Sequence, residues 1–251
     1  MTEDGTPAGE DGRAGRLLAW SAHLFTASGL VLALLALEAI HHQRWTEAML
    51  WLLLALAIDG IDGTLARAAR VQLLLPRIDG EALDLIIDYL NYVLIPTLLM
   101  WRSQVLPPGW ELEIAALILL SSLYVFVRRD MKTHDGYFRG FPALWNIVAL
   151  YLFYLRPEPA AAAAVILLLC ASSFAPVHFV HPFRVLDYGR WLLALSALWA
   201  IATAGLLLTG SMEALGSALL AISLSTAAAL VGLGLLRSFR GPRTNQQNVT
   251  A

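Results

Sequence analysis

Only one cysteine occurs in the chain, and this residue, Cys170, lies within an apolar run. A single thiol excludes a disulfide within the chain and a metal site built from several thiolates. Charged residues are also scarce, at 14% of the sequence, against roughly 25% in a typical soluble domain. The net charge is only -2 and no basic stripe is visible, so we expect no nucleic-acid partner.

Apolar residues are abundant instead, at 58% of the sequence. A soluble core of this size cannot hide so much apolar surface, whereas lipid covers it in a polytopic membrane protein. We therefore expect an all-α integral membrane protein with about eight transmembrane helices. The apolar runs that we interpret as spans are Leu17–Ile40, Ala48–Ala66, Leu83–Trp101, Leu112–Val127, Pro142–Leu155, Ala160–Val180, Trp191–Thr209 and Leu215–Leu236.

Basic residues are distributed unevenly between the loops that these spans define. Fourteen of the 17 Lys and Arg residues fall on one side, and only Arg44, Arg102 and Arg156 fall on the other. Cytoplasmic loops carry an excess of Lys and Arg. We therefore expect both termini, and the connection between the second and third helices, to face the cytoplasm.

The two ends of the chain differ in composition from the apolar middle. The first 15 residues are acidic and rich in Gly and Ala, without the basic start and short apolar stretch of a cleavable signal peptide. We expect residues 1–15 and 239–251 to be disordered tails. The transmembrane domain is then expected at residues 16–238, and its first span serves as the insertion signal.

Four aspartates flank the connection between the second and third expected helices. Asp59 and Asp62 are three residues apart, and Asp84 and Asp88 are four apart, so each pair lies on one helix face. Carboxylates beside hydrocarbon are costly and mark a functional site by default. A helical hairpin brings the two faces together, and cations between them would relieve the repulsion. The spacing therefore predicts a site for one or two Mg²⁺ or Mn²⁺ ions that clamp phosphate oxygens.

Other interpretations of the aspartates fit less well. They could form only surface salt bridges with Arg67, Arg70 and Arg77, which would leave their spacing without a role. An EF-hand has alternating acids in one loop that ends on Glu, unlike this segment. A cation-coupled transporter predicts a site at the midplane and repeated halves, whereas these acids lie at one end of their helices and no repeat is visible.

The order of the residues from Asp59 to Asp88 is D-x2-D-G-x2-A-R…G-x3-D-x3-D. This pattern resembles the signature of the CDP-alcohol phosphotransferases, which make phospholipids by displacing CMP or a related nucleotide. Twelve residues separate Arg67 from Gly80, a longer interval than is usual in the family, and this is similar to the bacterial phosphatidylcholine synthase branch. The resemblance covers most of the chain outside the tails. Further supporting segments are 23–27, 131–135, 138–142, 145–146 and 179–182.

That resemblance implies a specific reaction, in which the phosphatidyl group of CDP-diacylglycerol passes to choline and CMP is released. It also implies a multi-pass protein of the bacterial inner membrane, a cytoplasmic active site, Mn²⁺ or Mg²⁺, and a homodimer. Members of the family that use serine, glycerol phosphate or inositol phosphate are the nearest alternative. Carried onto this chain, the metal ligands are Asp59, Asp62, Asp84 and Asp88, with Asp88 also the base, and the CDP-diacylglycerol site contains Gly63, Ala66, Arg67 and Gly80.

Choline carries a permanent positive charge and no N–H group, so aromatic faces are the expected binding surface. For each aromatic residue the alternative is simple packing or a place in an interfacial belt. Lys132, Asp135 and Arg139 offer a similar choice, because they can either contact substrate or order their loop. The candidate choline contacts are Tyr89, Tyr92, Tyr124 and Trp145.

Overall fold

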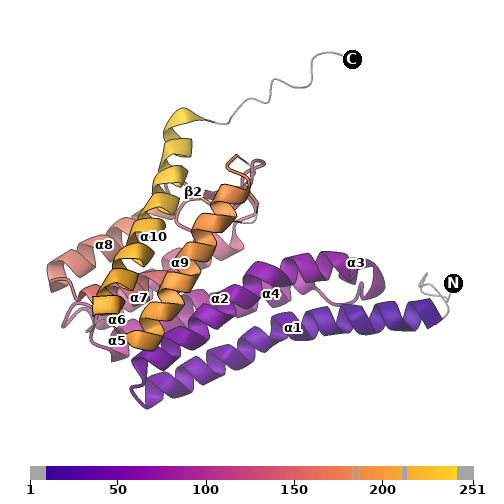
Figure 1. Cartoon of the computed structure of the whole chain (residues 1–251), viewed down its shortest axis with the longest axis horizontal. Helices are drawn as coiled ribbons and strands as arrows, with labels where there is room; N and C mark the ends of the chain where they lie inside the picture. Colours follow the sequence, from indigo (N-terminus) through magenta and orange to yellow (C-terminus); the bar gives the residue numbers. More distant parts are fainter. Residues whose placement is uncertain (1–9, 183, 186, 211–213, 242–251) are drawn as a thin grey trace. The chain divides into compact units, whose positions relative to one another are not determined.

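Helices account for 76% of the structure, which confirms the expected all-α class (Figure 1). The computed structural model describes residues 10–182, 184–185, 187–210 and 214–241. Residues 1–9 and 242–251, which make up most of the two expected tails, lie outside this described part. The described residues of Met1–Leu119 and Leu144–Ala162 form one compact unit, here called unit 1, and those of Leu120–Ala143 and Ala163–Ala251 form unit 2.

Five helical segments in the described part of the chain are long and apolar enough to cross a membrane, so the protein has the character of a multi-pass membrane protein. Three further expected spans coincide with shorter helices, α6 (Glu111–Val127), α7 (Trp145–Leu155) and α8 (Pro159–Ser172). The total of eight spans therefore stays a prediction. The five long segments are Gly12–His41, Trp45–Ala68, Gly80–Arg102, Arg190–Thr209 and Ala214–Arg240.

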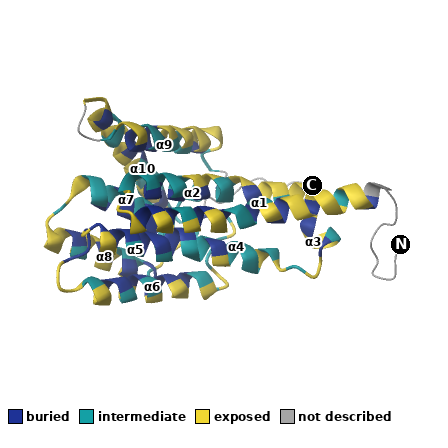
Figure 2. Cartoon of the chain, turned by 90° about the horizontal axis from the view of Figure 1, so that it is seen from below, coloured by how far each residue is buried: buried dark blue, intermediate teal, exposed yellow. Residues whose placement is uncertain are grey.

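Unit 1 is organised around α1 (Glu10–His41), which makes its most extensive contact with α2 (Trp45–Ala68). The buried faces of both helices are rich in alanine, and Figure 2 shows α1 with a buried stripe and an exposed one. Small side chains let two helices approach closely, which favours association inside a membrane. The buried alanines are Ala19, Ala22, Ala33, Ala36 and Ala39 on α1 and Ala48 and Ala55 on α2.

The connection after α2 sets the start of the next long segment. It contains the single turn α3 (Val71–Leu74) and ends at Asp79, whose carboxylate accepts a hydrogen bond of 3.0 Å from the Ala82 N–H. This cap starts α4 (Gly80–Tyr89) three residues before the expected Leu83.

The long segment that α4 begins is not a uniform α-helix. A π turn, η1 (Leu90–Leu94), joins α4 to α5 (Ile95–Arg102). Pro96 lies just beyond the turn, and its lack of an N–H group removes one hydrogen bond of a regular α-helix. Single π turns within α-helices occur frequently at functional sites.

Unit 2 contains a hairpin of α9 (Arg190–Thr209) and α10 (Ala214–Arg240). These helices are joined by a buried hydrogen bond of 2.7 Å between the hydroxyls of Thr203 and Ser223. Two short strands, β1 (Phe138–Arg139) and β2 (His178–Phe179), pair in antiparallel orientation.

Two of the expected span boundaries are wrong. The helix expected to reach Val180 ends at Ser172, because the segment beyond it contains Pro176 and then pairs as β2. The helix expected to begin at Pro142 begins at Trp145, because Ala143 has a φ of 57° and cannot continue a right-handed helix.

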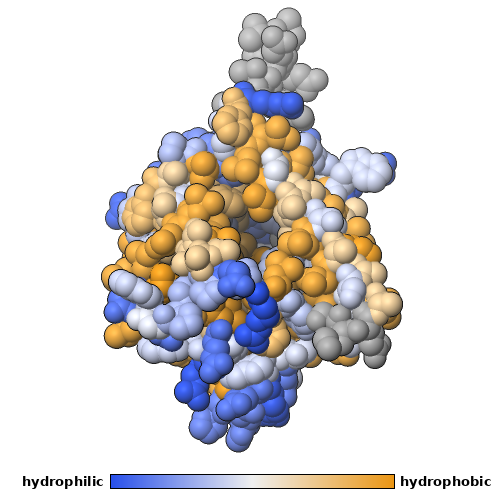
Figure 3. Space-filling view, turned by 90° about the vertical axis from the view of Figure 1, so that its left-hand side faces the viewer, coloured by the Kyte–Doolittle hydropathy of each residue, from blue (hydrophilic) through white to orange (hydrophobic). Residues whose placement is uncertain are grey.

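Large apolar side chains cover much of the surface. Leu120, Ile201 and Leu208 are each at least 67% exposed, and Figure 3 shows extensive hydrophobic surface on one face. Exposed apolar surface on this scale is unusual for a soluble monomer. It agrees with a protein whose solvent is partly lipid.

Candidate active site

Three of the four predicted aspartates come together in unit 1. Carboxylate oxygens of Asp59, Asp84 and Asp88 all lie within 4.8 Å of one another, and the three side chains are partly buried. Asp59 comes from α2, and the other two lie one helical turn apart on α4. Carboxylate oxygen is the donor that hard divalent cations such as Mg²⁺ and Mn²⁺ prefer. The cluster is therefore chemically suited to hold a divalent metal.

Asp62 is placed differently from the other three. Its side chain is only 6% exposed and is not part of the three-carboxylate cluster. It lies beside the Thr26 hydroxyl of α1, the Gly63 backbone N–H and the Arg67 guanidinium. The polar groups nearest this carboxylate thus belong to α1 and α2 rather than to α4.

The residues predicted to contact the diphosphate lie near the end of α2 and at the start of α4. Arg67 is exposed near the end of α2 and donates a hydrogen bond of 3.0 Å to the Thr64 hydroxyl. A Cβ atom on Gly63 would lie 3.3 Å from Arg67 Nη1, so the missing side chain leaves room for the guanidinium. Ala66 packs partly buried against residues of α1 and α3. A phosphate oxygen can therefore reach Arg67 without a bulky neighbour in the way.

Gly80 occupies the first position of α4 and lies against the ring of His23 from α1. A Cβ atom at position 80 would come 3.1 Å from His23 Cε1, closer than nearly all such contacts. His23 is 8% exposed. Glycine at this position therefore lets α4 begin directly beside α1.

The four aromatic candidates have very different surroundings. The Tyr89 hydroxyl donates a hydrogen bond of 2.9 Å to the Leu119 carbonyl, and Trp145 is fully buried in unit 1. Tyr124 belongs to unit 2, is 41% exposed, and stacks on Phe174 with 4.7 Å between ring centroids. Tyr92 is buried, and its hydroxyl faces the cluster of Asp59, Asp84 and Asp88. Of the four, Tyr92 is the one whose polar atom is directed at the acids.

Sequence reasoning did not foresee the groups that support the acids. Thr26 of α1 lies beside Asp62, and Asn91, which follows the α4 aspartates, donates a hydrogen bond to the Gly29 carbonyl of α1. The spacing carried a usable signal, because Asn91 and Tyr92 follow Asp88 at the third and fourth positions and so share its helix face.

The loop of unit 2 that contains Lys132, Asp135 and Arg139 is held by ion pairs. Asp135 accepts a hydrogen bond of 2.7 Å from Arg237 Nε of α10, and Arg139 pairs with Asp130 at 3.2 Å. Partial burial opposes ionisation of Asp135, but the hydrogen bonds from Arg237 and Thr133 lower its pKa below the ordinary value. For Asp135 and Arg139 these contacts favour the loop-ordering role.

Replacing Asp135 by Asn is expected to lower the free energy of unfolding by about 1–2 kcal/mol, because Arg237 loses a charged partner. The pKa of Asp135 is lower in the folded protein than in the unfolded chain, where it is about 3.9. The ionised carboxylate therefore stabilises the folded protein above about pH 3.9, and this stabilisation is lost as the pH falls through the folded-state pKa. Thermal melting in detergent at several pH values checks this. The difference between Asp135→Asn and the parent should be largest at neutral pH and vanish in acid; a constant difference would contradict it.

Two histidines of unit 2 serve packing rather than proton transfer. The His181 ring stacks on Phe138 with 4.9 Å between centroids. Burial, together with the nearby charges of Lys132 and Arg184, lowers the pKa of His181 to about 3. Burial also lowers the pKa of His178, whose backbone N–H donates to Ser238. Both rings are therefore neutral at physiological pH.

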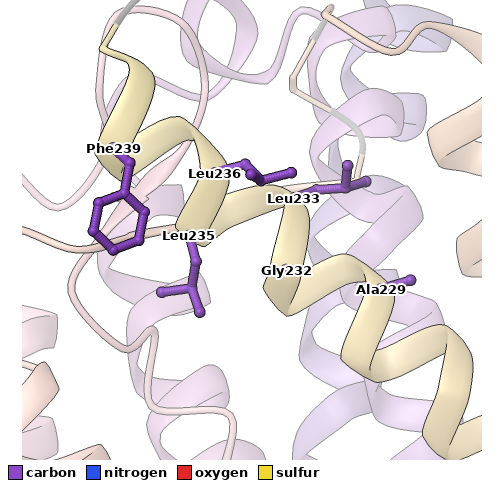
Figure 4. A pocket seen from close by; sticks show the side chains of 6 residues that line it. All are labelled: Ala229, Gly232, Leu233, Leu235, Leu236 and Phe239. Carbon is purple, nitrogen blue, oxygen red and sulfur yellow. The ribbon is translucent and has the colours of Figure 1, made fainter.

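An open apolar groove of about 530 Å³ lies along α10 (Figure 4). The side chains that line it contain no group able to bind a metal or a phosphate. The acidic cluster of unit 1 is therefore the better candidate for chemistry. The groove is lined by Ala229, Gly232, Leu233, Leu235, Leu236 and Phe239.

Known proteins that are similar to this chain belong to the family that the spacing of the aspartates resembles. Residues 19–177 match the CDP-alcohol phosphatidyltransferase family model. A phosphatidylcholine synthase of Pseudomonas aeruginosa is 44% identical over 222 residues, which is 88% of this chain and 92% of the relative. A phosphatidylcholine synthase of Mesorhizobium japonicum is 41% identical over 72% of this chain and 68% of the relative. One of Borreliella burgdorferi is 39% identical over 66% of this chain and 71% of the relative. The chain belongs to the CDP-alcohol phosphatidyltransferase family.

Proposed function

We propose that this protein is a phosphatidylcholine synthase, which transfers the phosphatidyl group of CDP-diacylglycerol to choline and releases CMP. The observation that carries the proposal is the cluster of Asp59, Asp84 and Asp88, whose oxygens lie within 4.8 Å of one another. The cluster lies in the part of the chain that matches the family model, and relatives similar over most of the chain bear this enzyme's name.

In this proposal the aspartates and Arg67 have separate tasks. Asp59, Asp62, Asp84 and Asp88 hold one or two Mn²⁺ or Mg²⁺ ions. Bound there, the cations neutralise the carboxylates and the charge of the diphosphate. Arg67 donates to phosphate oxygens, and the small residues Gly63, Ala66 and Gly80 let the diphosphate approach the backbone.

Asp88 is the proposed general base. It accepts the proton of the choline hydroxyl while that oxygen attacks the phosphorus that carries the diacylglycerol. The bond between this phosphorus and the oxygen bridging to the cytidylyl phosphate breaks, and CMP leaves. No covalent enzyme intermediate is needed. Choline itself is held by aromatic faces. Of the four candidates, Tyr89 and Tyr124 have ring surface to offer, whereas Tyr92 and Trp145 are buried.

The setting of the reaction follows from the distribution of charge. Fourteen of the 17 basic residues fall on the side that also carries the connection from α2 to α4. This bias supports eight spans with both termini and the active site facing the cytoplasm. The resemblance to the bacterial branch of the family adds the inner membrane as the location and a homodimer as the assembly, and residues 16–238 are the proposed catalytic domain.

A radiolabelled choline assay tests the function directly. Purified protein in CDP-diacylglycerol micelles with Mn²⁺ is expected to form labelled phosphatidylcholine and an equal amount of CMP. Parallel reactions with serine, glycerol phosphate and inositol phosphate identify the acceptor, because CMP release with one of these and none with choline would assign a different phosphatidyltransferase. No CMP release with any alcohol would refute the proposal.

A further inference from the structure

Tyr92 has a buried hydroxyl beside the acidic cluster. Its side chain is 4% exposed, and its hydroxyl faces Asp59, with Asp84 and Asp88 nearby. Among the described residues, this hydroxyl makes no hydrogen bond of ordinary geometry. A buried polar group without a partner is costly, so such a group within an active site calls for an explanation.

The backbone around Tyr92 is firmly held. The neighbouring Asn91 donates hydrogen bonds of 3.0 Å to the Gly29 carbonyl of α1 and 3.1 Å to the Ile87 carbonyl. A Cβ atom at position 29 would lie 2.7 Å from Ile87 Cγ2, so glycine there permits the close approach of α1. These contacts fix η1 against α1. The Tyr92 hydroxyl is thereby held in place before any ligand binds.

The position of Tyr92 in the helical segment also links it to the acids. Asp84, Asp88 and Tyr92 follow one another at intervals of four residues, which places them along one side of the segment. The π turn begins at Leu90, between Asp88 and Tyr92. The hydroxyl thus extends the row of α4 carboxylates and reaches towards Asp59 of α2.

We infer that Tyr92 is a positioning residue for the metal site, and that its hydroxyl donates a hydrogen bond to the Asp59 carboxylate when a divalent cation is bound and so orients this carboxylate toward the cation. This inference rests on the metal site of the proposed function. Carboxylates that ligate metals are in turn hydrogen-bonded, and these outer partners set ligand orientation. The role differs from a choline contact, because a ring that is 4% exposed offers little face to a quaternary ammonium.

Removing this hydroxyl is expected to weaken Mn²⁺ binding about tenfold, the lower end of the effect of losing an outer partner. Tyr92→Phe keeps the ring and removes only the oxygen. The dissociation constant is measured by electron paramagnetic resonance of free Mn²⁺ with purified protein in detergent, without CDP-lipid or choline. The metal-free melting temperature of Tyr92→Phe is expected to equal or exceed that of the parent, because the lost hydroxyl had no ordinary partner.

Tyr154→Phe is the matched control, since its hydroxyl lies beside Thr46 rather than the acids. It should leave the Mn²⁺ dissociation constant unchanged. Equal affinity of Tyr92→Phe and the parent, equal weakening in both variants, or no Mn²⁺ binding by the parent would each overturn the inference. Choline-dependent CMP release by the parent is measured separately, so a failed function and a failed role for Tyr92 give different results.

Discussion

Replacing Asp88 by Asn is expected to reduce the turnover number at least about 10³-fold. The amide matches the carboxylate in size, but it accepts a proton poorly and brings no negative charge to the cluster with Asp59 and Asp84. Proton transfer from choline and metal binding are therefore both impaired. Initial rates of CMP release at saturating Mn²⁺ measure the loss, and choline titration separates the turnover number from KM. The effect should fall mainly on turnover, because Asp88 acts on the hydroxyl rather than on the ammonium group.

Asp79→Asn provides the matched control for this substitution. Asp79 is exposed, caps α4 through the Ala82 N–H, and lies just before Gly80. Asparagine caps a helix about as well as aspartate, so this variant removes one neighbouring charge without removing the cap. It should retain most of the parent's activity. If Asp88→Asn keeps more than about a tenth of the parent's rate, or if both variants lose activity alike, the assignment of Asp88 as the base is wrong.

The meeting of three aspartates could be predicted from sequence because it depends on local regularity. Helical spacing fixes which side chains share a face, and a short connection keeps the ends of the two helices that it joins close together. Asp59, Asp84 and Asp88 satisfy both conditions, and their carboxylates meet as expected. Asp62 shares the face of Asp59 by spacing, yet it lies beside Thr26 of α1. A neighbour supplied by a third helix is not visible in a two-helix pattern.

Other features of the fold depend on contacts between distant segments. The π turn at Leu90–Leu94 adds a residue to one turn, and only the packing of Asn91 against Gly29 shows where it falls. The early end of α8 likewise reflects the pairing of β2 with β1, which lies about 40 residues earlier in the sequence. Hydropathy alone treats such a segment as a continuous span. Span boundaries in unit 2 were therefore less predictable than the acids of unit 1.

The acidic cluster implies a conflict between stability and function. Three carboxylates within 4.8 Å repel one another when no cation lies between them, and partial burial strengthens that repulsion. The metal-free protein should therefore be destabilised at the site where it is proposed to act. A bound cation reverses the effect, because any ligand that binds only the folded state stabilises it. The order of stability of parent and variant should consequently depend on metal.

Asp84→Asn is expected to show this reversal. In EDTA the free energy of unfolding of the variant should exceed that of the parent by about 1–3 kcal/mol, because one repelling charge is gone. Its melting temperature should then be several degrees higher. At Mn²⁺ near 100 times the parent's dissociation constant, the parent gains about 2.7 kcal/mol and the variant much less, so the order inverts. Turnover should fall at least about 10³-fold. Differential scanning fluorimetry in detergent measures the melting temperatures of parent and variant, once with EDTA and once with Mn²⁺.

Glu81→Gln separates a local effect of the cluster from a general effect of lost negative charge. Glu81 is an exposed acid in the first turn of α4, where a negative side chain interacts favourably with the helix dipole. Its replacement should therefore lower stability slightly in EDTA and leave the Mn²⁺-induced rise in melting temperature intact. If Asp84→Asn instead melts below the parent in EDTA, or gains as much from Mn²⁺ as the parent does, then repulsion relieved by a cation does not govern this site.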